Sequence, residues 1–231
     1  MNLNRIARII GAGYMLILVL GVYAHLFVRQ GLVIPGNAGM TANNIISNEG
    51  IFRGSIVVWL VVLLLDVIIV WALYVLLKTV HKELSMLTAL FRITYITVKG
   101  AALVNLLLVL GVLSGASYLT ALETKQLHAQ AMIYLEGDGY GFLVGLFFFG
   151  VHLILAGFLL FHSSYIPKIL SAGLMIAGIA YITDTVLSIL IPGYSSSGMA
   201  FKSVLMALMF LGELPPFIWL LFKGVKTQPA A

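Results

Sequence analysis

Long apolar runs joined by short polar links restrict the fold of this chain more than any motif does. Apolar residues make up 61% of its 231 residues and charged residues only 9%, and the mean hydropathy is +1.10. A membrane-spanning helix needs roughly 20 apolar residues. The sequence therefore predicts an all-α, polytopic bundle of six transmembrane helices, forming a single domain over residues 1–231. The expected spans are residues 7–28, 54–78, 86–113, 139–162, 168–191 and 202–223.

Two of these spans need comment. The first follows Arg5 and Arg8, as a signal peptide would, but the apolar run over residues 9–28 exceeds the roughly 7–15 residues of a signal sequence. We therefore expect it to remain as the first helix. The third has an uncharged part of only residues 100–113, so its helix must extend back past Lys99 and Arg92. We expect Arg92 to direct its charge toward the membrane boundary.

The distribution of basic residues predicts the orientation. The side that holds both termini carries Arg5, Arg8, Lys78, Lys82, Lys168, Lys223 and Lys226 against Glu83. The opposite side carries Arg29, Arg53, Lys125 and Lys202 against Glu49, Glu123, Glu136 and Asp138. Because cytoplasmic loops carry the excess of Lys and Arg, both termini are expected in the cytoplasm. The short links at 79–85 and 163–167 predict antiparallel pairs of helices two with three and four with five.

The two longer outer loops are expected to be partly helical. Residues 41–49 resemble a short capped helix that ends at Gly50, and Thr120 with Glu123 forms a capping box for a helix reaching residue 135. The net charge of +5 does not indicate nucleic-acid binding, because the basic residues lie at helix ends. The chain has no cysteine, which excludes disulfides, thiolate metal sites and iron–sulfur clusters.

Several short segments, distributed over nearly the whole chain, resemble a known family. They are Thr41-Ala42-Asn43-Asn44-Ile45, Gly141-Phe142 with Gly145, Phe148-Phe149-Gly150 and His152, Ser164-Tyr165-Ile166-Pro167, Tyr181-Ile182 with Asp184, and Gly212-Glu213 with Trp219-Leu220-Leu221 and Lys223-Gly224-Val225. In these segments the chain is similar to the bacterial six-helix membrane family known as domain of unknown function 4386. The resemblance implies a multi-pass protein of the bacterial cytoplasmic (plasma) membrane, and it implies no activity. Glu136-Gly137-Asp138 departs from the histidine-containing segment expected there, which puts in doubt a role for the outer end of helix four.

Ionisable residues lie near the middle of five of the six spans, where charges are costly and usually functional. These residues are Asp66, Lys99, His152, Asp184 and Glu213. At 1.5 Å per residue they fall within roughly 6 Å of one level. Glycine and alanine share helix faces with His152 and with Asp184, which indicates helix interfaces. The sequence therefore predicts a buried charge cluster at the membrane midplane.

The expected pair in this cluster is Asp66 with Lys99, on neighbouring antiparallel helices. Two acids and one weak base then remain, and because desolvation disfavours a charged carboxylate, at least one acid should be protonated or bind a cation. Pro215 and Pro216 follow Glu213 and lack N–H donors. They predict a broken helix with a hinge beside a midplane acid, as in many transporters.

Three functions remain open. The first is a small proton-linked transporter or ligand-binding membrane protein that uses Glu213, Asp184, His152, Asp66 and Lys99. The second is a non-catalytic sensor or assembly subunit whose charges only hold the bundle together. The third is an intramembrane enzyme using His152 and carboxylates, and we lean against an enzyme. We expect no cofactor and no metal, because His-x-x-x-His and Glu-x-x-His spacings are missing. The expected partners are the lipid bilayer and a small ligand or proton.

Overall fold

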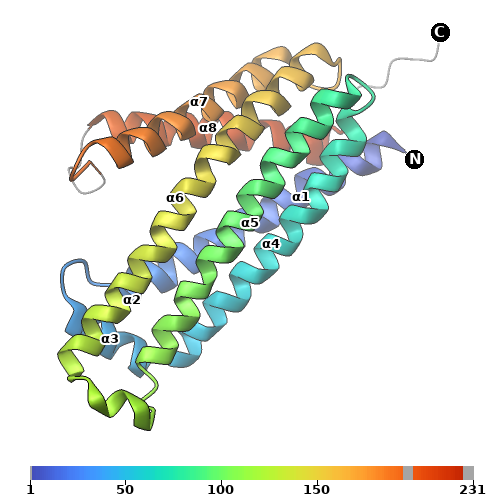
Figure 1. The fold of residues 1–231 in the computed structure, drawn as a ribbon. Helices are drawn as coiled ribbons and strands as arrows, with labels where there is room; N and C mark the ends of the chain where they lie inside the picture. Colours follow the sequence, from blue (N-terminus) through green and yellow to red (C-terminus); the bar gives the residue numbers. More distant parts are fainter. Residues whose placement is uncertain (1, 195–199, 226–231) are drawn as a thin grey trace. The chain divides into compact units, whose positions relative to one another are not determined.

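The computed structural model describes residues 2–194 and 200–225, and every regular element within these ranges is a helix (Figure 1). The long helices are α1 (Leu3–Val22), α4 (Glu49–Leu77), α5 (Lys82–Val112), α6 (Thr124–His162), α7 (Lys168–Leu190) and α8 (Ala200–Phe222). The shorter ones are η1 (Tyr23–Arg29), α2 (Gln30–Leu32), α3 (Ala38–Ser47) and η2 (Ser117–Ala121). With η1 and α2 continuing α1, six helices in the described residues are long and apolar enough to cross a membrane. The predicted six-helix, all-α architecture is confirmed.

The fourth span begins earlier than predicted. The expected outer helix and the expected span at 139–162 are one helix of 39 residues, α6, which starts at Thr124. Glu136-Gly137-Asp138, which was expected between these two helices, lies inside α6, and Asp138 is buried and ion-paired there. A short 3₁₀ helix, η2, occupies part of the predicted capping box.

The other outer loop also differs in detail from its prediction. The short helix is α3, which begins three residues before the expected start and ends at Ser47. Asn37 caps it, because its side chain accepts a hydrogen bond from the backbone of Met40 at 2.9 Å. Gly50 does not end this helix but lies in the first turn of α4. A glycine at a helix end is a common stop signal, yet here the chain restarts a helix at once.

The first span contains a stretch of π-helix. Residues Tyr23–Arg29 form η1 between α1 and α2. The wider turn of a π-helix is rare and is frequent at functional positions. It changes the direction of side chains relative to a regular helix, and Arg29 is its last residue.

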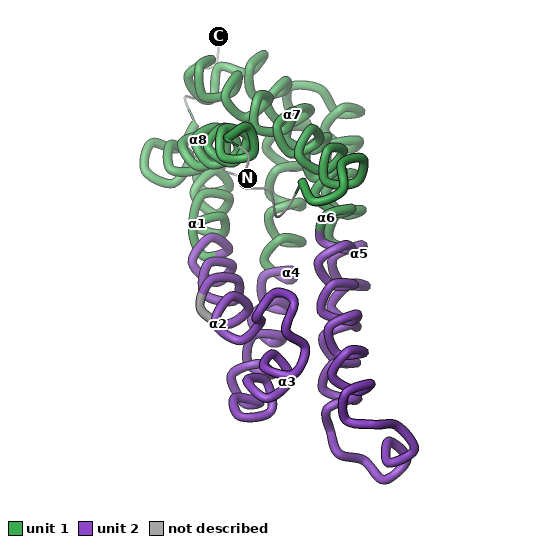
Figure 2. The backbone as a smooth tube through the Cα atoms, turned by 90° about the vertical axis from the view of Figure 1, so that its left-hand side faces the viewer, with its two compact units in different colours: residues 1–16, 65–96, 143–231 green, residues 17–64, 97–142 purple. Residues whose placement is uncertain are grey.

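The chain divides into two compact units, which are coloured separately in Figure 2. Unit 1 comprises Met1–Leu16, Leu65–Ile96 and Leu143–Ala231, and unit 2 comprises Ile17–Leu64 and Thr97–Phe142. Helices α1, α4, α5 and α6 contribute residues to both. The extent of a single domain over residues 1–231 stays a prediction.

Glycines allow the helices of unit 1 to approach closely. A Cβ on Gly178 of α7 would overlap the carbonyl oxygen of Gly150 in α6. On its other side, α7 packs against α8, where a Cβ on Gly212 would overlap the carbonyl oxygen of Gly173. The expected small-residue face of α7 is therefore a helix interface. In unit 1, α6 and α7 pair as the short link predicted.

The two short links of unit 1 lie at the same end. The hydroxyls of Thr79 and Tyr165, one from each link, are 2.6 Å apart. The α4–α5 pair is joined near its link by a hydrogen bond of 3.1 Å from the Ser85 hydroxyl to the Tyr74 carbonyl. Both predicted hairpins are thus present, with their links on one side.

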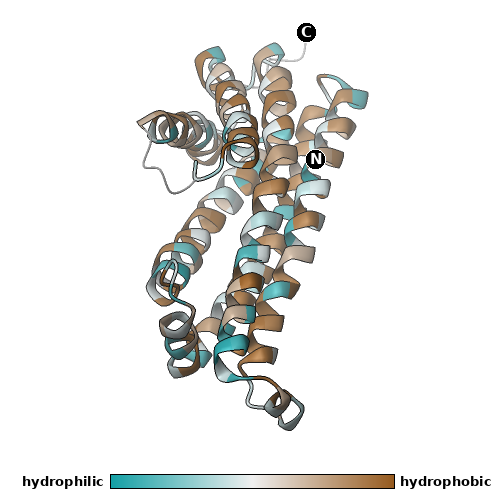
Figure 3. Ribbon diagram, turned by 60° about the vertical axis from the view of Figure 1, so that its left-hand side comes forward, coloured by the Kyte–Doolittle hydropathy of each residue, from teal (hydrophilic) through white to brown (hydrophobic). Residues whose placement is uncertain are grey.

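The outer surfaces of the helices are apolar. Figure 3 shows hydrophobic residues over most of the length of the helices. Large apolar side chains that are exposed include Ile169 of α7 and Leu211 and Phe222 of α8. Because the charged side chains Asp66 and Arg92 are buried instead, this distribution is inverted relative to a water-soluble protein and fits contact with lipid.

Candidate functional site

A buried ion pair joins α4 and α5 within unit 1. Asp66 and Arg92 are only 2% and 1% exposed, respectively. The Arg92 Nε donates to Asp66 Oδ1 at 3.1 Å, and Nη2 donates to the same oxygen. A buried charge without a partner is strongly destabilising, so each of these residues depends on the other.

The remaining donors of Arg92 reach two other helices. Nη1 donates to the hydroxyl of Tyr14 in α1 and lies 3.1 Å from Nε2 of His152 in α6. The other ring nitrogen of His152, Nδ1, is 2.9 Å from the carbonyl oxygen of Thr88. A carbonyl can only accept, so Nδ1 carries the proton and Nε2 accepts from Arg92. His152 is therefore a neutral hydrogen-bonding residue with both nitrogens in use.

Aromatic rings enclose the same guanidinium. Its central carbon lies 4.6 Å from the ring centroid of Tyr14 and 5.2 Å from that of Phe149. Cation–π contacts of this kind stabilise a desolvated cation. The expectation that Arg92 reaches toward the membrane boundary is wrong, because neighbouring helices supply an acid, two neutral acceptors and two rings.

Glu213 of α8 differs from Asp66 in its surroundings. The hydroxyl of Tyr181 in α7 donates to Glu213 Oε2 at 2.8 Å. Within the described residues, no lysine, arginine or histidine nitrogen lies within 4.0 Å of its carboxylate. Glu213 is half-buried. It is an acid near the centre of a spanning helix that has no basic partner in direct contact.

The aromatic residues connect Glu213 with the Arg92 pair. The Tyr181 ring meets the ring of Phe149 edge to face, with centroids 5.4 Å apart. Phe217, one turn after Glu213, stacks on the ring of Tyr14 at 3.3 Å. Tyr14 therefore contacts both Phe217 of α8 and the guanidinium of Arg92. A movement of α8 at Glu213 would reach the buried ion pair through these rings.

Asp184 stands apart from these contacts. Its carboxylate accepts a hydrogen bond of 3.1 Å from the hydroxyl of Tyr194, whose side chain is buried. In the ranges that the structure describes, no three His, Asp or Glu side chains are placed to hold a metal ion. The convergence of His152 with two carboxylates, which would favour an enzyme, is not found there.

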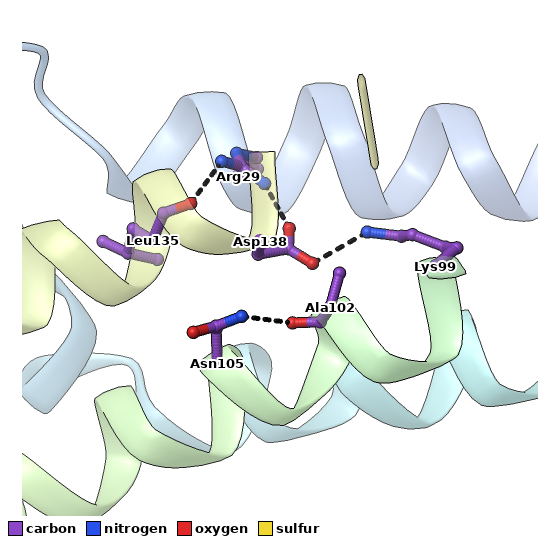
Figure 4. A network of polar contacts seen from close by, with 6 residues as sticks. All are labelled: Arg29, Lys99, Ala102, Asn105, Leu135 and Asp138. Atoms are coloured by element: carbon purple, nitrogen blue, oxygen red, sulfur yellow. Dashed lines mark hydrogen bonds and ion pairs between the residues drawn. The ribbon is translucent and has the colours of Figure 1, made fainter. Parts of the chain in front are cut away.

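Unit 2 holds a second buried network, shown in Figure 4. Asp138 of α6 accepts from Lys99 Nζ at 2.8 Å and from Arg29 Nη1 at 2.5 Å (Figure 4). Arg29 also donates to the carbonyl oxygen of Leu135 at 2.8 Å. The ammonium of Lys99 lies near two aromatic rings, 4.7 Å from the centroid of Trp59 and 5.0 Å from that of Phe142. One carboxylate thus compensates two cations.

The predicted pair of Asp66 with Lys99 is wrong, since each residue has another partner. Arg92 and Lys99 are seven residues apart and share a face of α5, about 10 Å apart along the axis. Arg92 takes Asp66, and Lys99 takes Asp138. Asp138 was not expected as a partner, because the span predicted at residues 139–162 begins after it.

Other residues of these networks also escaped prediction. Tyr14 binds Arg92, and Tyr181 binds Glu213. Arg29 binds Asp138. Tyrosine in an apolar run gives no signal of its own. Arg29 was expected only as a charge of the outer side, just beyond the span predicted to end at residue 28, but it is the seventh and last residue of η1. The hydrogen bond between Tyr181 and Glu213 could be predicted only once the close contact between α7 and α8 was known.

The helix around Glu213 is not broken, contrary to the prediction. Pro215 and Pro216 lie inside α8, which continues to Phe222. Proline fixes φ near the helical value, so it removes hydrogen bonds without forcing the chain out of the helix. The carbonyls of Leu211 and Gly212 therefore lack their usual N–H donors. A membrane helix tolerates this where neighbouring groups compensate.

Comparisons with known proteins agree with the resemblance in the sequence. A family described as "Domain of unknown function (DUF4386)" matches residues 9–224. An "Uncharacterized protein" from Archaeoglobus fulgidus is 35% identical over 174 residues, which cover 75% of this chain and 86% of the relative. No solved structure matches the chain. The expected family is confirmed, and no activity comes with it.

Proposed function

This chain belongs to the family of unknown function DUF4386, and we propose that it is a proton-linked transporter or ligand-binding protein for a small solute. Glu213 is the residue that takes up and releases the proton. The protein acts in the cytoplasmic membrane of a bacterium, with both termini in the cytoplasm. The orientation rests on the excess of basic residues on the side of the termini.

One observation supports this proposal above the others. Asp66 and Asp138 have basic partners in direct contact, whereas among the described residues Glu213 receives only the hydroxyl of Tyr181. An unpaired carboxylate in a low-dielectric environment is more easily kept neutral than charged. Glu213 therefore binds a proton when the site is closed to water and releases it when water enters.

The neighbours of Glu213 suit this exchange. The Tyr181 hydroxyl can donate to either protonation state of the carboxyl group and keeps its orientation fixed. Pro215 and Pro216 leave two backbone carbonyls of α8 without N–H donors, and these carbonyls can bind a solute, a cation or water. The prolines also permit α8 to bend at this point.

Arg92 couples the proton to the rest of unit 1. It contacts Asp66, Tyr14 and His152, and Tyr14 stacks on Phe217, which follows Glu213 by one turn of α8. A shift of α8 on deprotonation of Glu213 would move Phe217 against Tyr14 and so disturb this ion pair. The three helices that hold Arg92 would respond together.

A second function is favoured by different observations. Both buried networks consist of closely paired groups, with Asp66 and Asp138 each bound to a base. Such networks can serve only to fix the helices of a sensor or assembly subunit. This alternative predicts that Glu213 is also structural and that its protonation has no consequence for binding.

The experiment uses purified protein in liposomes that contain a pH-sensitive dye, with a panel of small solutes added outside. We expect a solute-dependent change of internal pH that disappears in Glu213→Gln, because the amide cannot carry the proton. The matched control is Glu83→Gln, whose side chain is 81% exposed in the first turn of α5; it should retain the signal. Equal signals from the two variants would contradict the role of Glu213 and favour the structural alternative.

A further inference from the structure

A basic pocket lies in unit 1, where α1 begins and α8 ends. Its volume is about 560 Å³. The residues that carry the argument are Asn2, Asn4, Arg5, Arg8, Ala12 and Lys223. Leu221 and Ile9 add apolar surface. The pocket shares no residue with the site around Glu213.

The walls of this pocket are held by specific contacts. A Cβ on Gly11 would lie 2.6 Å from the backbone nitrogen of Leu221, so α1 and α8 touch backbone to backbone. The side chain of Asn4 accepts a hydrogen bond from the backbone of Val225 at 2.9 Å. Gly224 makes the turn that permits this bond, with φ of 67°. The concave shape is therefore fixed by the backbone.

The charge of the pocket is strongly one-sided. Arg5, Arg8 and Lys223 line it, and no acidic side chain does. Among the described residues, none of these three bases has a carboxylate within 4.0 Å. Three cations around one cavity repel one another, and an anion placed between them would relieve that repulsion.

The lining also indicates the chemical class of that anion. Arginine side chains bind phosphate oxygens through two parallel N–H donors, and lysine adds a point charge. Asparagine amides supply further polar contacts, while Leu221 and Ile9 present apolar surface beside the cations. We propose that this pocket binds a phosphate group, carried either by an anionic phospholipid or by a soluble phosphate ester. Basic pockets at the ends of spanning helices commonly hold lipid head groups.

The experiment measures binding to the purified protein in uncharged detergent. The probes are phosphatidylglycerol, phosphatidylcholine and glycerol 3-phosphate, and the readouts are native mass spectrometry and thermal stability. The triple variant Arg5→Gln/Arg8→Gln/Lys223→Gln should bind phosphatidylglycerol or glycerol 3-phosphate, whichever the wild type binds, at least about tenfold more weakly than the wild type does. The control Lys78→Gln/Lys82→Gln/Lys168→Gln loses the same charge elsewhere and should bind normally.

A second variant keeps all the charges. Ala12→Phe fills the pocket, so it should also weaken binding while the protein remains folded. Binding of phosphatidylglycerol alone would identify a lipid as the source of the phosphate, and binding of glycerol 3-phosphate a soluble ester. The proposal would be overturned if neither phosphatidylglycerol nor glycerol 3-phosphate bound to the wild type. Equal losses of binding in the two triple variants, or normal binding by Ala12→Phe, would also overturn it.

Discussion

Removal of one member of the buried Asp66–Arg92 pair should destabilise the protein far more than a surface substitution would. Both side chains are almost completely buried, at 2% and 1% exposure. Asp66→Asn leaves the guanidinium with only neutral partners, Tyr14 and His152. Loss of one partner from a buried ion pair costs about 3–5 kcal/mol. Arg92→Met should cost a similar amount, because it leaves the Asp66 carboxylate alone.

The double variant distinguishes pairing from simple burial. Asp66→Asn/Arg92→Met contains neither charge, so its loss should be smaller than the sum of the two single losses by about 1–3 kcal/mol. The assay is the free energy of unfolding in mixed detergent micelles, followed by circular dichroism. Additivity of the two losses within about 0.5 kcal/mol would refute the coupling.

A parallel cycle provides the control. Asp66 and Lys99 share no partner, because Lys99 binds Asp138. The losses of Asp66→Asn and Lys99→Met should therefore add within about 0.5 kcal/mol. Strong coupling in this second cycle would restore the pairing that the sequence favoured.

Three further predictions concern the other contacts. Asp138→Asn should lower the free energy of unfolding by about 3–5 kcal/mol. The loss should exceed that of Lys99→Met, because Lys99→Met leaves Asp138 paired with Arg29; denaturation of the two variants side by side tests this order. His152→Phe should cost about 1–3 kcal/mol by removing an acceptor of Arg92, and an unchanged melting temperature would contradict the assigned bond. Gly212→Ala should cost about 1–3 kcal/mol, because its Cβ overlaps a backbone carbonyl of α7; Gly54→Ala, which meets nothing within 4 Å, should be neutral or stabilising.

The sequence predicts the spans and the helix pairs well because these depend on hydrophobic length and short links. The six runs long enough to cross a bilayer correspond to six long helices in the part of the chain that the structure describes. The face of α7 that carries Gly173 and Ala177 meets Gly212 of α8. Hydrophobicity and small-residue patterns act locally, so they can be read from the chain.

The ion pairs could not be predicted because they depend on register and rotation between helices. Arg92 and Lys99 both lie on α5 close enough to the predicted depth of Asp66 to pair with it. Depth in the membrane alone therefore does not determine which of the two bases binds Asp66. The extent of α6 decides the question, since it places Asp138 within a helix and gives Lys99 its own acid. The tyrosine partners require the packed structure, because a hydroxyl in an apolar run has no sequence signature.

The protonation state of Glu213 is the most direct test of the proposed function. Infrared difference spectra of the purified protein in lipid would detect a protonated carboxyl group. The spectra are recorded from about pH 6 to about pH 8, roughly one unit on either side of neutrality. We expect a carboxyl band near neutral pH that is lost in Glu213→Gln and retained in Asp66→Asn. A band that persists in Glu213→Gln, or no band in the wild type, would mean that Glu213 is ionised and would contradict its role as the proton carrier.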